Sequence, residues 1–437
     1  MWHSERKENT LREVFASIPV PEGKGFWPTL RAFMGPGFMV AVGYMDPGNW
    51  ATDLAGGASF GYTLLSVVLV SSIFAMVLQH LALKLGVATG RDLAQACGDA
   101  FSKPVAIFLW FICEIAIAAC DLAEVVGSAL ALHLLFEIPI LVGILITILD
   151  VFLILYFQNR GFKKLEAIVM AMLGIITLCF AYELLVSKPE IGSIVKGLLP
   201  SSSIITDSKQ LYVAIGILGA TVMPHNLYLH SSIVQTRAIG DQPIKKAQAI
   251  KFATYDSSIS LGFAFFINAG ILILSAAAFH LSGNQHVADI RDAYQLLDPV
   301  LGDRFASTLF AIALLASGQN ATVTGTLAGQ IVMEGFLDLK IKPWIRRLLT
   351  RLLAIVPAFF VTLLYGESRI NDLLIFSQVV LSMQLSFAVI PLVLFTSDAS
   401  KMGQFVNSKF LQIVSWTISL IILGLNLYLL AQVFGWA

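Results

Sequence analysis

Charged residues are scarce in this chain. Asp, Glu, Lys and Arg make up 13% of its 437 residues, whereas soluble proteins carry about 25%. The hydrophobic fraction is 57%, which excludes an ordinary water-soluble domain and indicates a protein of the lipid bilayer. Basic and acidic residues are equally numerous, at 28 each, so net charge gives no reason to expect a nucleic-acid partner.

Three familiar sequence signals are also missing. No basic stretch followed by a short apolar core and a cleavage site opens the chain, so we expect no cleaved signal peptide. No HExxH pair or His/Cys catalytic set occurs, which argues against a membrane-embedded metalloenzyme, and we expect no cofactor. The cysteines show no CxxC spacing, and we interpret them as small buried hydrophobic residues: Cys97, Cys113, Cys120 and Cys179.

Long apolar stretches dominate what is present. A helix that crosses a bilayer needs about 20 mostly apolar residues. Eleven such stretches occur, separated by short polar loops, and the longest loop, 282–304, contains a short helical pattern at 290–297. The expected spans are 32–58, 62–84, 104–132, 138–157, 165–185, 210–236, 255–281, 305–334, 350–365, 371–396 and 410–435. The sequence therefore predicts an all-α integral membrane protein.

The basic residues indicate an orientation. Of the 28 Lys and Arg residues, 22 lie in the N-terminal segment 1–31 and in the loops after the second, fourth, sixth, eighth and tenth spans. Cytoplasmic loops are enriched in Lys and Arg. We therefore expect a cytoplasmic N-terminus and, because the number of spans is odd, an extracytoplasmic C-terminus.

Two spans carry a proline in the middle, within matching patterns. The first span contains Asp46-Pro47-Gly48-Asn49, and the sixth contains Met223-Pro224-His225-Asn226. Proline removes a backbone donor and clashes with the preceding turn, so each helix should unwind at bilayer depth. Such breaks persist where they line a protein-enclosed site. Because the two breaks lie five helices apart, they indicate inverted repeats, at about 32–186 and 209–396, with the site between them. Two unrelated proline kinks are the alternative interpretation.

Apart from residues at the span margins, such as Arg351, the charged residues inside the spans are acidic, which indicates a route for cations. They include Asp46, Asp53, Glu114, Asp121, Glu124 and Asp150. In an unwound segment, the oxygens of Asp46 and Asn49 and the Gly43 carbonyl can converge, with the freed Ala220 carbonyl and the Met223 thioether arriving from the other break. Oxygen ligands alone suit magnesium or calcium, whereas a sulfur ligand favours transition metals. The alternatives are a simple N-cap at Asp46 and ordinary packing of Met223.

Two stretches resemble the paired signature motifs of the Nramp family of proton-coupled divalent metal transporters. They are Met45-Asp46-Pro47-Gly48-Asn49 and Gly219-Ala220-Thr221-Val222-Met223-Pro224-His225-Asn226-Leu227-Tyr228-Leu229-His230. The resemblance extends over the chain from about residue 30, and length and span number are similar to those of the bacterial manganese-transporting members. It implies a LeuT-like fold of five plus five helices with an eleventh appended in 397–437. It also implies import of Mn²⁺, and of Fe²⁺, Co²⁺ and Cd²⁺, by alternating access.

The same resemblance implies roles for individual residues. The metal site would comprise Asp46, Asn49, Met223, the carbonyls of Gly43 and Ala220, and, on closure, Gln378. The proton relay would use Asp121, Glu124, His225 and Arg351, and Gln79, His230 and Asn268 would support the conformational change. The chain departs from the family in the tenth span, where Gln384-Leu385-Ser386-Phe387 replaces the usual Gln-Leu-Pro-Phe.

Other interpretations stay open at this point. Asp121 and Glu124 share a helix face, which fits a relay or a structural polar stripe. His225 could titrate near physiological pH or only hydrogen-bond to the broken helix. A transporter of the same architecture could carry an organic substrate with sodium, although Asp46 would repel a substrate carboxylate. A magnesium-transporting relative and a passive channel are further alternatives. The expected partners are metal ions, protons and lipid, and the chain is compatible with a monomer.

Overall fold

The structure is a computed structural model, and it is a bundle of helices. It describes residues 9–433 apart from residues 22, 151, 153–155, 157–160, 284–288, 338–341 and 366–368. Within that part of the chain, the β pairing is limited to an isolated bridge between Ile18 and Arg237. The prediction of an all-α protein is confirmed for these residues.

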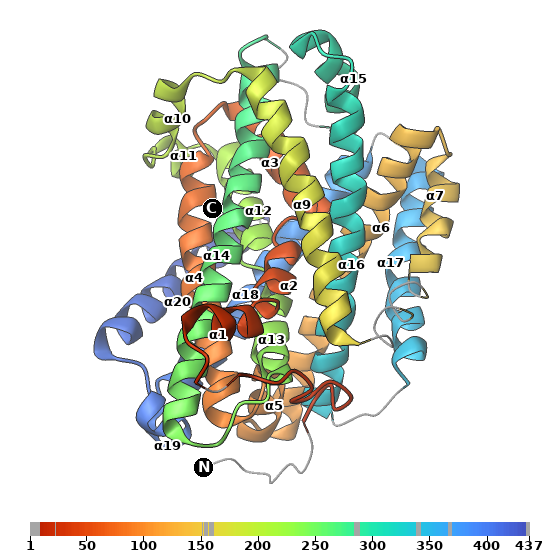
Figure 1. Cartoon of the computed structure of the whole chain (residues 1–437). Helices are drawn as coiled ribbons and strands as arrows, with labels where there is room; N and C mark the ends of the chain where they lie inside the picture. The colour runs from red at the N-terminus through yellow and green to blue at the C-terminus, as the bar shows by residue number, and fades with distance from the viewer. Residues whose placement is uncertain are drawn as a thin grey trace.

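The helices follow the chain in the order labelled in Figure 1. The first half contains α1 (Phe26–Phe33), α2 (Pro36–Gly43), α3 (Pro47–Phe60), α4 (Leu65–Thr89), α5 (Leu93–Ala100), α6 (Lys103–Phe136), α7 (Ile140–Ile146), α9 (Phe162–Ser187) and α10 (Ile191–Gly197). The second half contains α11 (Ser203–Thr206), α12 (Ser208–Thr221), α13 (Pro224–Ile233), η1 (Val234–Thr236), α14 (Pro243–Ser275), η2 (Ala276–His280), α15 (Ile290–Leu301), α16 (Ala306–Leu337), α17 (Pro343–Tyr365), α18 (Ile370–Thr396), α19 (Ala399–Met402), η4 (Gly403–Phe405) and α20 (Lys409–Val433).

Helices lie in every range in which the sequence predicts a span, and α15 matches the short helix expected in the longest loop. In the described chain, seven helices are long and apolar enough to cross a membrane. The first span is not among them because its break leaves α2 with 8 residues and α3 with 14. Part of the fourth expected span, 138–157, lies outside the described residues. Eleven crossings and the division into two repeats stay predictions.

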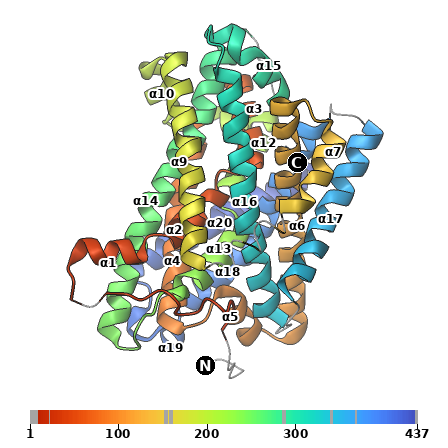
Figure 2. The same ribbon diagram turned by 45° about the vertical axis from the view of Figure 1, so that its right-hand side comes forward.

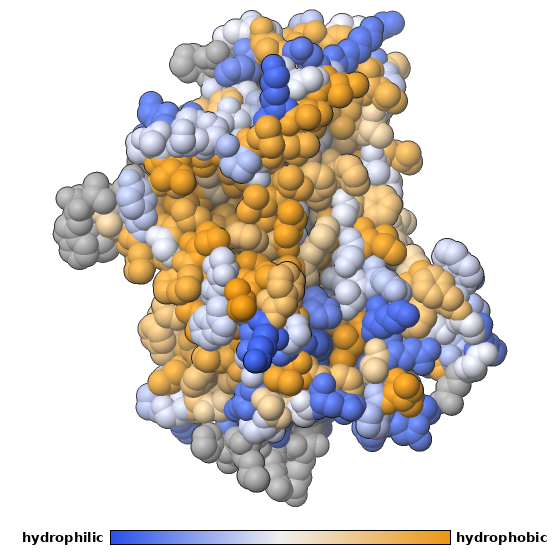
Figure 3. All heavy atoms as spheres, turned by 90° about the vertical axis from the view of Figure 1, so that its left-hand side faces the viewer, coloured by the Kyte–Doolittle hydropathy of each residue, from blue (hydrophilic) through white to orange (hydrophobic). Residues whose placement is uncertain are grey.

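The face of the bundle in Figure 3 carries a broad apolar band. In Figures 1 and 2, α9, α14 and α16 run along the long dimension of the molecule, whereas the broken pairs α2–α3 and α12–α13 lie inside. Hydrophobic side chains cover the middle of the face in Figure 3, and hydrophilic ones gather at its upper edge and in its lower third. This distribution is the one that a bilayer requires.

The start of the first span differs from the prediction. The sequence predicts that the first span, 32–58, runs without interruption from residue 32 to its central break. In the structure, α1 ends at Phe33 and α2 begins at Pro36. Gly35 separates them with a φ of +144°, a conformation that favours glycine, and a Cβ atom there would collide with the Glu166 carboxylate. Pro36 is suited to the first position of a helix because its missing N–H would have no partner there. In Figure 2, α1 lies across the bundle and projects from it.

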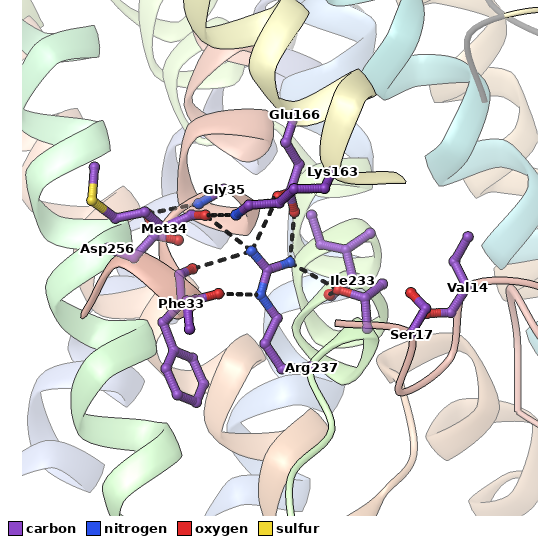
Figure 4. A network of polar contacts seen from close by, with 12 residues as sticks. Val14, Ser17, Phe33, Met34, Gly35, Lys163, Glu166, Ile233, Arg237 and Asp256 are labelled. Atoms are coloured by element: carbon purple, nitrogen blue, oxygen red, sulfur yellow. Dashed lines mark hydrogen bonds and ion pairs between the residues drawn. The ribbon is translucent and has the colours of Figure 1, made fainter. Parts of the chain in front are cut away.

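Charged side chains clamp this junction from two sides (Figure 4). Arg237 donates hydrogen bonds to the carbonyls of Ala32 and Met34 at 3.1 and 3.0 Å, and Lys163 donates to the Met34 carbonyl at 2.8 Å. These carbonyls end α1 and lack helical partners. At the N-terminus of α2, the Asp256 carboxylate accepts hydrogen bonds from the backbone N–H groups of Gly35 and Gly37, at 3.3 and 2.6 Å.

The cation at the centre of the clamp is fully buried and paired. Arg237 contacts both carboxylate oxygens of Glu166, at 2.5 and 3.2 Å, and neither side chain is exposed. The clamp joins the end of η1 to the N-terminal part of α9 and, through Asp256, to α14. Charge patterning placed Arg237 in a cytoplasmic loop, and the sequence carried no signal for this network.

Candidate metal site

Each break frees one carbonyl by the same mechanism. In a helix, the carbonyl of residue i accepts the N–H of residue i+4. Four residues after Gly43 and Ala220 come Pro47 and Pro224, which have no N–H. Helix α2 ends at Gly43 and α12 ends at Thr221, so both predicted breaks are confirmed at the expected positions. Buried free carbonyls need other partners, and a cation is one of them.

Other backbone groups of the first break are bonded by neighbouring side chains. The Tyr44 carbonyl accepts from Asn268 at 2.8 Å, and the Met45 carbonyl accepts from Trp50 at 3.2 Å and also from Ser317. The unwound segment is therefore held in place, as irregular backbone at membrane depth must be. Asn268, expected only to support the conformational change, contacts the break directly.

Asp46 and Asn49 meet at the start of α3. The Asp46 Oδ1 atom accepts from the Asn49 backbone N–H at 2.8 Å and from its side-chain Nδ2 at 2.9 Å. The N-cap interpretation of Asp46 is therefore correct as geometry. The Asn49 Nδ2 atom also donates to the Ala220 carbonyl at 3.2 Å, so one amide group joins the two breaks. All three residues are buried.

The second asparagine of the repeated pattern makes the reciprocal contact. Asn226, in the second break, donates from Nδ2 to the Val40 carbonyl of α2 at 3.5 Å. Its side chain lies against Gly43, where a Cβ atom would collide with it. Each x-Pro-x-Asn motif thus reaches the backbone of the other broken helix. The repeated sequence pattern alone predicts no role for Asn226.

Gln378 lies against the first break. Its Nε2 atom is 3.4 Å from Asp46 Oδ2, and the amide packs on Gly48, where a Cβ atom would collide with it. Ser386, which replaces the family's proline, does not interrupt α18, and Gln378 reaches Asp46 without a proline there. Asn426 of α20 lies 3.5 Å from the Ser386 hydroxyl and donates to the Ser382 carbonyl at 2.6 Å.

Met223 is fully buried and directly precedes Pro224 at the start of α13. In the described part of the chain, no group of three or more His, Cys, Asp or Glu residues is arranged to hold a metal ion. A cation between the breaks would therefore depend on mixed donors, namely one carboxylate, amide oxygens, carbonyls and a thioether. Such a set is less attractive to hard ions than an all-oxygen cage.

The acids of α6 form a separate polar cluster. Glu124 Oε2 lies 3.4 Å from Arg351 Nη1, and Asp121 and Glu124 both face Gly325 of α16. Arg351 also contacts Asp150 at 3.4 Å, and Asp150 accepts from Gln319 at 2.8 Å. The structure thus brings Asp121, Glu124 and Arg351 together, and their role in a proton relay stays a prediction. Asp150 had no predicted role, because it lies on a different helix and no local spacing relates it to Arg351.

A cysteine lies between this cluster and the second break. The Cys120 Sγ atom is 3.5 Å from Glu124 Oε1 and 3.8 Å from His225 Nε2. All four cysteines are buried, as expected, and none of them forms a disulfide within the described residues. Cys120 is nevertheless more than a packing residue, since it contacts members of the predicted relay on two helices. Sequence reasoning missed this contact.

Gln79 and His230, which the resemblance assigns to the conformational change, form a chain of hydrogen-bonded side chains with Tyr44, next to the first break. Gln79 donates to the Tyr44 hydroxyl at 2.6 Å, and its Oε1 atom is 2.9 Å from His230 Nδ1. This chain links α4 and α13 to the residue that follows α2. Movement of α2 relative to α13 would break it.

Together, the apolar exposed surface, the two broken helices and the buried oxygen and sulfur atoms between them are typical of a membrane transporter. Residues 37–432 match the family model for natural resistance-associated macrophage protein-like proteins, abbreviated Nramp. A divalent metal cation transporter MntH of Listeria innocua is 59% identical over 429 residues, covering 98% of this chain and 96% of that protein. The chain belongs to the Nramp family.

Solved structures agree with this assignment. A mutant of the manganese transporter of Eremococcus coleocola is 41% identical, with a TM-score of 0.90 and coverage of 98% of this chain and 92% of that one. The nucleobase-cation symporter Mhp1 is only 12% identical but has a TM-score of 0.59 over 96% of each chain. The predicted LeuT-like fold is therefore confirmed, and the protein is a secondary transporter rather than an enzyme.

Proposed function

We propose that the chain imports divalent transition-metal ions, Mn²⁺ foremost, together with protons, by alternating access. The observation that carries the proposal is the contact between the breaks, where the Asn49 amide bonds at once to Asp46 and to the Ala220 carbonyl. Two acceptors from different helices converge there on one positively polarised N–H₂ group. A cation can replace that group as the link between them.

The proposed ligands are the groups that a cation would meet if it replaced the Asn49 N–H₂ group. Rotation of the Asn49 amide by half a turn presents its oxygen, so Asp46, Asn49, and the Gly43 and Ala220 carbonyls supply oxygen donors. Met223 supplies sulfur, and Gln378 joins on closure. The names of the Listeria and Eremococcus relatives support divalent metal and manganese as substrates. Both an organic anion, repelled by Asp46, and magnesium, poorly matched to a thioether, fit less well.

Protons would use a route beside the metal. From the second break it passes His225 and the acid pair Asp121–Glu124 to Arg351. The contacts of Cys120 with His225 and Glu124 support continuity of this route. Because α6 and α17 carry it, the protons need not follow the metal past α2.

The proposed setting is the cell membrane, with the N-terminus cytoplasmic, the C-terminus outside and the chain working as a monomer. The core would be 32–396, with repeats at about 32–186 and 209–396, followed by 397–437. The distribution of Lys and Arg supports the orientation, and the matched Asn49 and Asn226 contacts support the repeats.

Uptake into proteoliposomes tests the proposal. Mn²⁺, Fe²⁺, Co²⁺, Cd²⁺, Mg²⁺ and Ca²⁺ are offered with and without an acidic exterior, and internal pH is recorded. We expect saturable Mn²⁺ uptake that an acidic exterior accelerates, accompanied by internal acidification. Equal uptake of Mg²⁺ would favour a magnesium transporter. Downhill Mn²⁺ flux that never exceeds equilibrium under the pH gradient would favour a channel.

A further inference from the structure

Helix α1 presents an apolar, aromatic surface away from the bundle. Leu30 and Phe33 share one face of the helix with Phe26 and are buried against α14 and α4, whereas Phe26 is 46% exposed and the neighbouring Trp27 is 75% exposed. Phe26 packs against Phe252 of α14 at a ring-centroid distance of 5.4 Å. The helix is therefore attached to the protein along this face, and the aromatic side chains at its start extend from the attached face into a different apolar environment.

The exposed residues of helix α14 indicate where this surface lies relative to the bilayer. Apart from Ile244 in its first turn, which is 74% exposed, its exposed residues up to Lys251 are polar or small, and an apolar stripe then runs from Tyr255 through Ile259 and Phe263. From Tyr255 to Ser275 the helix rises about 30 Å, which is the thickness of a hydrocarbon core. Tyr255, whose ring lies 6.0 Å from that of Phe26, thus marks the edge of this core.

The residues gathered at this edge are those that membrane interfaces select. Trp and Tyr are enriched there, and Lys and Arg extend their charges toward the headgroups. Lys24 and Arg31 of the α1 region are exposed, and within the described chain no hydrogen bond or ion pair occupies either one. The Lys251 ammonium lies 5.9 Å from the centre of the Tyr255 ring. Two cations thus flank the aromatic residues of α1 in the sequence, and a third lies beside Tyr255.

We propose that α1 lies in the headgroup region of the cytoplasmic leaflet and binds anionic phospholipids through Lys24, Arg31 and Lys251. Phe26 and Trp27 enter the boundary of the acyl chains, while Leu30 and Phe33 keep the helix on the bundle. The continuity of its apolar face with the lipid-facing stripe of α14 identifies the occupant as lipid. The assignment to the cytoplasmic leaflet rests on the orientation given under the proposed function.

This attachment would act on the metal site through the clamp. Arg237 and Asp256 fix the end of α1 and the start of α2 to the same buried network, and α2 ends at Gly43. A leaflet that holds α1 therefore resists the displacement of α2 that would open the site to the cytoplasm. Anionic lipid would accordingly favour the closed cytoplasmic side.

A fluorophore attached at Pro28→Cys tests contact with lipid, and Gln242→Cys is the matched control. Position 28 is exposed on α1, whereas position 242 precedes α14 and lies about 20 Å farther from the membrane edge along that helix. In phosphatidylcholine vesicles that contain phosphatidylglycerol, we expect a lipid-borne nitroxide to quench position 28 several-fold more than position 242. Equal quenching would overturn the proposal.

Charge dependence is tested in the same vesicles. Replacing phosphatidylglycerol with phosphatidylcholine should reduce quenching at position 28, and Lys24→Gln with Arg31→Gln should remove that difference. Each basic residue near an anionic surface strengthens attraction by about five-fold. Lys196→Gln with Lys209→Gln, two exposed cations elsewhere, should leave the difference unchanged. Quenching independent of phosphatidylglycerol would overturn the recognition of anionic lipid.

The result does not depend on metal transport. Quenching is measured without metal, so failure of Mn²⁺ uptake would leave the lipid proposal standing, and failure of quenching would leave the transport proposal standing. In intact cells, an impermeant thiol reagent should fail to modify Gln242→Cys. Modification from outside would overturn the assignment to the cytoplasmic leaflet.

Discussion

The clamp at the α1–α2 junction gives a quantitative prediction for stability. Arg237→Met removes a buried cation that contacts Glu166 at 2.5 and 3.2 Å. Breaking a buried pair costs about 3–5 kcal/mol because the remaining charge loses its partner. Lys163, 3.1 Å from Glu166 and half exposed, continues to offset part of that loss. The carbonyls of Ala32 and Met34, which accept its two shorter backbone-directed hydrogen bonds, also lose a donor, at about 1 kcal/mol each, so we expect a total loss of about 4–5 kcal/mol.

A double-mutant cycle separates the pair from its surroundings. Glu166→Gln keeps a hydrogen-bond acceptor and should cost about 2 kcal/mol. In the double mutant neither charge is stranded, so its loss should be smaller than the sum by about 1–3 kcal/mol. The assay is reversible unfolding in SDS, followed by circular dichroism. Arg369→Met, which breaks a pair whose side chains are both 65% exposed, is the control and should cost less than about 1 kcal/mol. Additive losses, or equal losses for Arg237→Met and the control, would refute the reasoning.

Three further predictions concern transport. Met223→Ala should keep appreciable Mn²⁺ uptake, lose Cd²⁺ affinity and become sensitive to Ca²⁺; unchanged Cd²⁺ binding and continued indifference to excess Ca²⁺ in uptake assays would make the sulfur a packing group. Asp121→Asn should reduce proton flux in vesicles more than Mn²⁺ binding, and an unaltered flux and pH profile in this variant and in His225→Ala would remove both from the relay. Gly48→Ala places a methyl group against the Gln378 amide. Calorimetry should therefore record a Mn²⁺ affinity that is lower by about tenfold, which is equivalent to one lost polar contact. Wild-type affinity would show that Gln378 is not needed.

The breaks were predictable because their cause is local. Proline removes one N–H wherever it occurs in a helix, so Pro47 and Pro224 identify the freed carbonyls without any knowledge of the fold. The residues around them were predicted for the same reason. That Asn49 and Asn226 would each reach the other broken helix was not predictable, because it depends on how α2 and α12 pack.

The clamp and the cysteine contact show what sequence reasoning lacks. Arg237 has the sequence environment of a cytoplasmic loop cation, and only the folding of η1 against α9 buries it beside Glu166. Cys120 reads as a small apolar residue on an apolar helix, yet α13 brings His225 to it. Both results depend on tertiary packing between segments more than 70 residues apart.

Helix α1 was not predicted as a separate element because it directly precedes the apolar run of α2. Its eight residues continue directly toward the apolar run of α2, so a search for long apolar stretches merges the end of α1 with the first span. The positive φ of Gly35 separates the two helices. A Gly-Pro pair at positions 35 and 36 is the signal that could have indicated the boundary.

Manganese binding to Asp46→Asn, measured by titration calorimetry on purified protein, tests the central claim most directly. Asp46 supplies the only carboxylate in the proposed ligand set, so its loss should abolish detectable binding while the folded protein is retained. Glu183→Gln is the matched control, because Glu183 is an equally buried acid on α9 whose oxygens have no hydrogen-bond partner among the residues that the structure describes. It should bind Mn²⁺ as the wild type does. Wild-type affinity in Asp46→Asn, or equal loss in both variants, would contradict the assignment of the metal site to the two breaks.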